Sequence, residues 1–98
     1  MTIVVNPEAE AEIEQAADFY HGRQQGLDEQ FLAEIAAAFD RIVRFPDAAP
    51  AVGRGARRLV LARFPYVIVY RVQGDEIRVY AVAHQKRRPG YWRKRLSR

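Results

Sequence analysis

Residues 57–91 of this 98-residue chain read RRLVLARFPYVIVYRVQGDEIRVYAVAHQKRRPGY, and this stretch decides the fold. It is rich in β-branched and aromatic residues, in runs interrupted at Phe64-Pro65-Tyr66 and at residues 73–76. This pattern predicts three consecutive antiparallel strands followed by a basic, aromatic exit. Gly74 can adopt the positive φ that the tight turn of a hairpin needs.

The predicted hairpin register assigns each side chain to one face of the sheet. If Val72 lies opposite Ile77, then Ile68 lies opposite Ala81. One face is then apolar throughout and carries Ile68, Tyr70, Val72, Ile77, Val79 and Ala81. The other is a mixed face with a basic end and carries Val67, Val69, Arg71, Arg78, Tyr80, Val82 and His84. The apolar face needs a cover from the rest of the chain.

The N-terminal half predicts a short strand and a helical hairpin. After the β-prone run of residues 2–5, Asn6 is a good N-cap, and Pro7 suits the first position of a helix that ends before residue 26. Its buried face repeats at helical spacing through Ala9, Ile13, Ala16, Ala17 and Tyr20, and its polar side carries Glu10, Glu12, Glu14 and Asp18.

A second helix, with Asp28 as the N-cap, is predicted to end at Pro46. Its apolar stripe of Phe31, Ile35, Phe39 and Ile42 is the expected cover for the sheet. Residues 46–55 are rich in Pro, Gly and Ala and are interpreted as an irregular loop. The element order is therefore β-α-α-β-β-β. This order predicts a single α+β domain over residues 1–98, with the helical hairpin on one face of a mainly antiparallel sheet.

Charge is divided unequally between the two halves of the chain. Residues 1–50 hold ten acidic and three basic residues, a net charge of −7. Residues 51–98 hold two acidic and thirteen basic residues, a net charge of +11. Such asymmetry favours an acidic or polyanionic partner for the basic half, where Tyr91 and Trp92 lie among the basic residues. The alternative is a protein with one acidic and one basic surface that binds nothing in particular.

Composition sets further limits. The chain has no cysteine and only two histidines, His21 and His84, so no disulfide, metal site or cofactor is expected. No apolar run is long enough to span a bilayer, and the N-terminus lacks the pattern of a signal peptide. A cytoplasmic protein without membrane contact is the default expectation.

Several segments carry a resemblance through their order and spacing. They are Ala9-Glu10 to Tyr20, Gly26 with Phe31-Leu32, Ile42 to Pro46, Arg57-Arg58, Phe64-Pro65-Tyr66, Tyr70, Val79-Tyr80-Ala81-Val82, and His84 followed by Arg87. In these features the chain resembles the ParE/RelE superfamily of toxins from bacterial type II toxin–antitoxin systems, and its ParE-like branch in particular. The resemblance covers nearly the whole chain. It implies a small α+β toxin that is held inactive by a cognate antitoxin, an acidic and partly disordered chain that folds on contact.

The resemblance leaves two main activities open. ParE-like members poison DNA gyrase by binding it, whereas RelE-like members cleave mRNA on the ribosome without a metal. For cleavage, the candidate catalytic residues are Arg63, His84, Arg87 and Tyr91, with Arg57 and Arg58 nearby in sequence. The lysine-rich second strand of the cleaving enzymes is missing, and no glutamate occurs between Gly53 and Gly74 to act as a base. Gyrase binding is therefore the favoured reading. A basic nucleic-acid-binding domain without toxicity is a third.

For a binding toxin, the expected contact surface is the C-terminal basic cluster. Its residues are Arg87, Arg88, Tyr91, Trp92, Arg93, Lys94 and Arg95. From His84 onward the chain has seven Lys and Arg and no acid, which argues against internal neutralisation. Each feature also has a structural alternative: His84 as a hydrogen-bonded strand-end residue, Arg63 in a salt bridge, and Tyr91-Trp92 closing the core over the mixed sheet face. The residues that bind the antitoxin stay unassigned.

Overall fold

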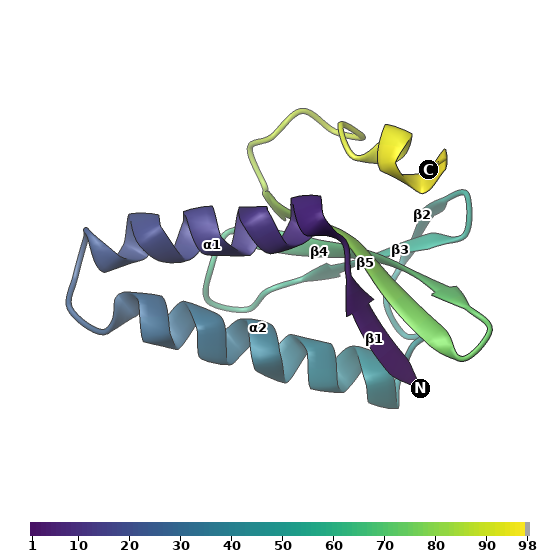
Figure 1. The fold of residues 1–98 in the computed structure, drawn as a ribbon, viewed down its shortest axis with the longest axis horizontal. Coiled ribbons are helices and arrows are strands. Elements are labelled where there is room, and N and C mark those ends of the chain that lie inside the picture. The colour runs from purple at the N-terminus through teal and green to yellow at the C-terminus, as the bar shows by residue number, and fades with distance from the viewer. Residues whose placement is uncertain (98) are drawn as a thin grey trace.

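Two helices cover one face of a five-stranded sheet (Figure 1). The chain after the last strand, residues 85–97, covers the other face and is called the C-terminal segment below. This arrangement is seen in a computed structural model, which describes residues 1–97. The elements in chain order are β1 (Thr2–Val5), α1 (Pro7–His21), α2 (Leu27–Arg44), β2 (Ala51–Gly53), β3 (Ala56–Val60), β4 (Tyr66–Gln73), β5 (Glu76–His84) and the 3-10 helix η1 (Arg93–Ser97). The predicted α+β class and helical hairpin are confirmed.

The sheet has the strand order β1-β5-β4-β3-β2. β1 pairs with β5 in parallel, and the other neighbours are antiparallel, so the sheet is mainly antiparallel as expected. The expectation of an irregular loop over residues 46–55 is wrong at its end, because Ala51–Gly53 forms an edge strand against β3. Positive φ angles at Gly53, Arg54 and Gly55 turn the chain back sharply enough to make this hairpin.

Both predicted N-caps differ in detail from the structure. α1 begins after Asn6, but the side chain of Asn6 does not cap it; its Oδ1 instead accepts a hydrogen bond from Arg78 Nη1 at 2.8 Å. α2 begins at Leu27, one residue before the expected cap, because Gly26 occupies the N-cap position with φ of 80°. Asp28 lies within the first turn, where its carboxylate is 3.2 Å from His21 Nδ1. The ends of both helices agree with the prediction.

The main core lies between the helices and the sheet. Its centre is an aromatic cluster in which the ring of Phe31 lies about 5.3 Å from those of Phe64 and Tyr66 and 5.4 Å from that of Tyr20. Phe31, Ile35 and Ile42 of α2 are buried against Ile68, Tyr70, Ile77 and Val79, with Phe39 partly buried beside them. The expected cover for the sheet is therefore confirmed.

A β-bulge in β5 corrects the predicted register. Tyr70 pairs with Val79 as expected, but Val69 pairs with Ala81, so Tyr80 is an extra residue without a partner. Beyond the bulge Ile68 lies opposite Val82, not Ala81. One inserted residue reverses the alternation of side chains, so Val82 enters the helix-side core and Ala81 turns to the opposite face.

That opposite face holds a second, smaller core. Trp92 and Leu96 of the C-terminal segment are 8% and 6% exposed, and they pack on Val67, Val69 and Tyr80 of the sheet. The expectation that the aromatic exit closes the core over the mixed face is confirmed for Trp92. Within residues 1–97, no helix is long and apolar enough to cross a membrane.

Candidate functional site

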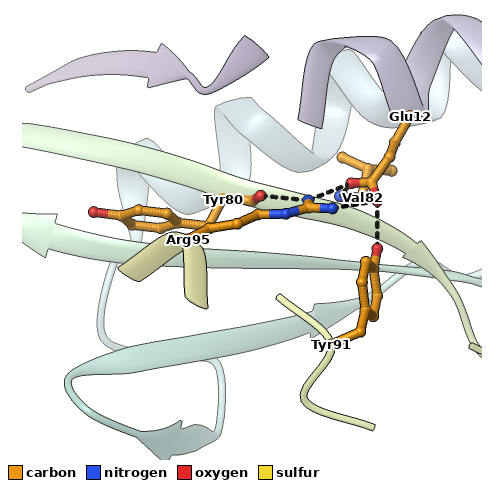
Figure 2. A network of polar contacts seen from close by, with 5 residues as sticks. All are labelled: Glu12, Tyr80, Val82, Tyr91 and Arg95. Carbon is orange, nitrogen blue, oxygen red and sulfur yellow. Dashed lines mark hydrogen bonds and ion pairs between the residues drawn. The ribbon is translucent and has the colours of Figure 1, made fainter. Parts of the chain in front are cut away.

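A buried polar network fastens the C-terminal segment to α1 (Figure 2). Glu12 forms a two-point ion pair with Arg95, with Nη1–Oε1 at 3.0 Å and Nη2–Oε2 at 3.2 Å. The Tyr91 hydroxyl donates to Oε2 at 2.5 Å, and the Val82 backbone N–H donates to Oε1 at 3.0 Å. The side chains of Glu12 and Arg95 are only 12% and 15% exposed. One carboxylate therefore ties together α1, β5 and the C-terminal segment.

The same network changes the acid–base behaviour of two side chains. Burial is the largest cause that raises the pKa of Tyr91, and the hydrogen bond and charge of Glu12 raise it further. Burial lowers the pKa of Arg95, but the hydrogen bonds and charge of Glu12 outweigh it, and the net shift is upward. Tyr91 therefore remains a protonated donor committed to Glu12, and Arg95 remains charged.

A second anchor directly follows Arg95 in the chain. Arg71 Nη2 donates to the backbone carbonyl of Leu96 at 3.2 Å and to the hydroxyl of Tyr80 at 3.1 Å. With Trp92 buried between Tyr91 and Arg95, the chain from Tyr91 to Leu96 is held against the sheet.

A hollow of about 280 Å³ opens between this segment and the sheet. Its basic lining comes from three elements: Arg58 of β3, His84 at the end of β5, and Arg87, Arg88 and Arg93 of the C-terminal segment. Its apolar lining includes Val67, Ala83 and Trp92, and none of the described lining residues is acidic. We refer to this hollow as the basic pocket. Within the described part of the chain, its four arginines form no ion pair with a carboxylate.

Two of the pocket arginines, Arg87 and Arg93, approach their neighbours closely. The guanidinium of Arg87 lies over the ring of Tyr91, 4.0 Å from its centroid, and that of Arg95 lies 5.0 Å from the same centroid. Arg93 folds back over Gly90, where a Cβ would lie 3.0 Å from the guanidinium; Gly90 also has φ of 76°. The glycine therefore serves both the turn and the close approach of Arg93.

His84 has the structural role expected of a strand-end histidine. Its ring meets Tyr66 edge to face, with centroids 5.2 Å apart. Its Nδ1 lies 3.0 Å from the backbone N of Lys86 and accepts that N–H. In this tautomer the other ring nitrogen, Nε2, carries the proton and is a donor.

The candidate catalytic residues do not all come together. His84, Arg87 and Tyr91 line the basic pocket, but Arg63 does not. Arg63 pairs with Glu34 of α2, with Nε–Oε1 at 3.1 Å, so the salt-bridge interpretation is the correct one for this residue. Arg57 Nη1 donates a hydrogen bond to the backbone carbonyl of Ala49 at 2.8 Å.

The contact-surface residues also divide into two groups. Arg87, Arg88, Arg93 and Lys94 are exposed, whereas Tyr91 is half-buried, Trp92 is buried and Arg95 is paired with Glu12. The expectation that the basic cluster is not neutralised internally is therefore wrong for Arg95. Arg98, the seventh basic residue after His84, lies outside the described residues.

Glu12 is the residue that the sequence interpretation missed, because it was assigned to the polar side of α1. Helical spacing contains the signal: Glu12 lies three residues after Ala9 and four before Ala16, both of which are buried. A carboxylate at such a position requires a buried cation or several donors.

The Glu34–Arg63 pair predicts a pH-dependent contribution to stability. Burial raises the pKa of Glu34, but the hydrogen bonds and charge of Arg63 outweigh it and hold the pKa below the ordinary value of 4.5. A lowered folded-state pKa stabilises the fold above about pH 4.5, and this stabilisation is lost as the pH falls through the folded-state pKa. Because the side chain of Arg63 is 65% exposed, we expect Glu34→Gln to cost at most about 1 kcal/mol at pH 7.

Urea unfolding at pH 7 and pH 3 tests this expectation. The difference between wild type and Glu34→Gln should shrink on acidification. Glu29→Gln, on an exposed position of the same helix, is the matched control and should show no such change. An equal cost of Glu34→Gln at both pH values would contradict the expectation.

The chain belongs to the family described as "ParE toxin of type II toxin-antitoxin system, parDE", whose model matches residues 3–89. The fold is similar to that of a chain in the solved structure "Chromosomal ParDE TA system from P. aeruginosa". The TM-score is 0.63 at 21% identity, covering 86% of this chain and 95% of the other. Among curated proteins, no relative matches.

Proposed function

We propose that this ParE-family toxin acts in the cytoplasm by binding DNA gyrase and inhibiting it, and that a cognate acidic antitoxin neutralises it. The observation that carries the proposal is the exposed basic surface of Arg87, Arg88, Arg93 and Lys94. It is mounted on a segment that Glu12, Arg71 and Trp92 hold rigidly against the sheet. A rigid, unneutralised surface loses little freedom on binding and attracts an acidic partner over long range.

The arrangement favours binding over cleavage. A metal-independent ribonuclease must deprotonate the ribose hydroxyl and protonate the leaving oxygen. In this chain the Tyr91 hydroxyl is committed to Glu12, His84 Nδ1 accepts a backbone N–H, and Arg63 belongs to a different surface. One observation favours RNA cleavage as the second candidate, namely that His84, Arg87 and Tyr91 share the basic pocket.

The antitoxin is proposed to dock on the helical side of the molecule. An apolar hollow of about 290 Å³ lies between the end of α2 and β3; it is lined by Ile42, Phe45, Leu59 and Tyr70, with Arg41 at its side. Phe45 is 61% exposed, more than any other large apolar side chain of the described residues. An amphipathic helix with an acidic face would bury Phe45 and pair with Arg41.

A gyrase assay with supercoiled plasmid tests the proposed target. The purified toxin should yield linear, gyrase-linked DNA. Arg87→Ala/Arg88→Ala should require about tenfold more protein for the same yield, which corresponds to a loss of about 1.4 kcal/mol of binding free energy. Arg23→Ala/Arg44→Ala removes the same charge from exposed positions elsewhere and should act like wild type. Absence of the linear product, together with cuts in translated mRNA, would replace gyrase binding with the second candidate.

A further inference from the structure

We propose that the basic pocket is a binding site for the phosphodiester backbone of nucleic acid, whose phosphates contact the guanidinium groups of Arg58, Arg87, Arg88 and Arg93. The inference concerns the surface used in the proposed function. It rests on that function only for the source of the phosphate, which would be the DNA that gyrase holds.

The side-chain hydrogen-bonding groups that line the pocket are mostly donors. The four guanidinium groups carry donors only and no acceptor atom. His84 presents Nε2–H as a donor, because its Nδ1 accepts the hydrogen bond from Lys86 N–H. Among the described lining residues, the other side-chain acceptors are the amide oxygen of Gln85 and the hydroxyl of Tyr91, which is turned toward Glu12. Such a lining matches a ligand that carries only acceptors. The planar fork of a guanidinium fits two phosphate oxygens at once.

The charge of the pocket is not balanced from within. None of its described lining residues is acidic, although the chain has twelve Asp and Glu. The acidic residue nearest in the network, Glu12, is already satisfied by Arg95, Tyr91 and Val82. The apolar wall of Val67, Ala83 and Trp92 excludes water on one side, which strengthens the attraction for an anion.

The pocket is also prearranged for its ligand. The Tyr91 hydroxyl donates a hydrogen bond to Glu12, which fixes the position of the ring. The guanidinium of Arg87 packs on this ring, 4.0 Å from its centroid. Glu12 and Tyr91 are thus positioning residues for Arg87. Gly90 gives the space in which Arg93 folds back toward the pocket. Arginines that are already ordered lose less conformational entropy when they bind.

A nucleic-acid backbone fits these observations better than an acidic peptide does. The basic residues continue along the chain from the pocket, through Arg93 to the exposed Lys94. This arrangement fits a polymer with a negative charge on every nucleotide better than it fits a ligand with a single carboxylate. The arginines of the pocket, with Lys94 beside them, would then contact successive phosphates of the backbone.

Salt-dependent binding to nucleic acid of fixed sequence tests the inference. The full chain is titrated into fluorescent single-stranded DNA, duplex DNA and single-stranded RNA at salt concentrations from about 50 to 200 mM. Over this range the affinity of a protein that contacts several phosphates falls steeply. Four phosphate contacts predict a slope of log K against log [salt] of about −3 to −4. Arg58→Gln, Arg87→Gln and Arg88→Gln should each reduce that slope by about one. Arg23→Gln, an exposed arginine on the helical hairpin, should leave it unchanged.

A double-mutant comparison tests the role of Tyr91. Tyr91→Leu should weaken binding to the DNA in the wild-type background and have little further effect in Arg87→Gln, because it acts through Arg87. Thermal unfolding of each variant accompanies the binding data. Equal effects of Tyr91→Leu in the two backgrounds would overturn the positioning role.

The outcomes separate this inference from the proposed function. Unchanged salt slopes in the three pocket variants, with gyrase inhibition lost, would show that the pocket binds gyrase protein and would overturn the inference alone. Pocket-dependent slopes in a toxin that never inhibits gyrase would support the inference and reject the proposed target. Tighter binding to DNA or to RNA then identifies the source of the phosphate.

Discussion

Replacing Glu12 with alanine is expected to lower the free energy of unfolding by about 3–5 kcal/mol, the usual cost of removing one partner from a buried ion pair. The substitution leaves the Val82 N–H without its acceptor and the guanidinium of Arg95 without its carboxylate, although Arg95 Nη1 still donates to the Tyr80 carbonyl at 3.0 Å. Both groups lie in a region with little access to water. A domain of this size has roughly 5–15 kcal/mol of stability in total. The melting temperature should therefore fall by more than about 10 °C.

Two comparisons isolate the ion pair. Glu14→Ala removes a carboxylate from an exposed position on the same helix and should change stability by less than about 0.5 kcal/mol. Glu12→Met/Arg95→Met removes both charges and should recover much of the loss, since no unpaired charge stays buried. If Glu12→Ala cost no more than Glu14→Ala in urea unfolding, the network would contribute nothing to stability.

The second large effect is expected from Trp92→Ala. Trp92 is 8% exposed and is the largest side chain of the core between the C-terminal segment and the sheet. Truncation of a buried tryptophan costs about 3–5 kcal/mol through lost burial and the cavity left behind. Because the segment also bears most of the basic pocket, binding to DNA and inhibition of gyrase should fall together with stability.

Trp92→Phe provides the matched variant, because it keeps most of the apolar volume and should retain the larger part of the stability. Lys94→Ala, two residues away and exposed, should be nearly neutral. Chemical unfolding followed by circular dichroism measures all three. A loss below about 1 kcal/mol in Trp92→Ala would mean that the second sheet face does not depend on this segment.

The helix-side half of the fold was predictable because local patterns and the global fold agree there. The stripe from Phe31 to Ile42 has helical spacing, and Val72 opposite Ile77 fixes the hairpin register near the turn. The β-bulge at Tyr80 was not predictable. Ala81 and Val82 are both apolar and fit either face, so hydrophobic alternation does not record the inserted residue.

The pocket was predictable only in part. Charge asymmetry identified the basic segment, and His84 and Arg87, which were named as candidates from the sequence, line the pocket. The sequence did not show that Arg63 lies outside the basic pocket, because the end of a strand does not reveal which way the following loop turns. Its acceptor, Glu34, lies 29 residues earlier in the chain. The role of Arg95 likewise depends on a carboxylate 83 residues away.

That long-range fastening has a consequence for how the protein is made. Synthesis delivers α1 first, yet the groups that satisfy Glu12 arrive only with β5 and the segment through Arg95. β1 likewise has no neighbouring strand to pair with until β5 has been synthesised. A nascent chain that has completed both helices thus has the apolar hairpin but no basic pocket. The arginine-lined surface therefore forms only after the C-terminal segment has been synthesised and has folded back onto α1 and the sheet.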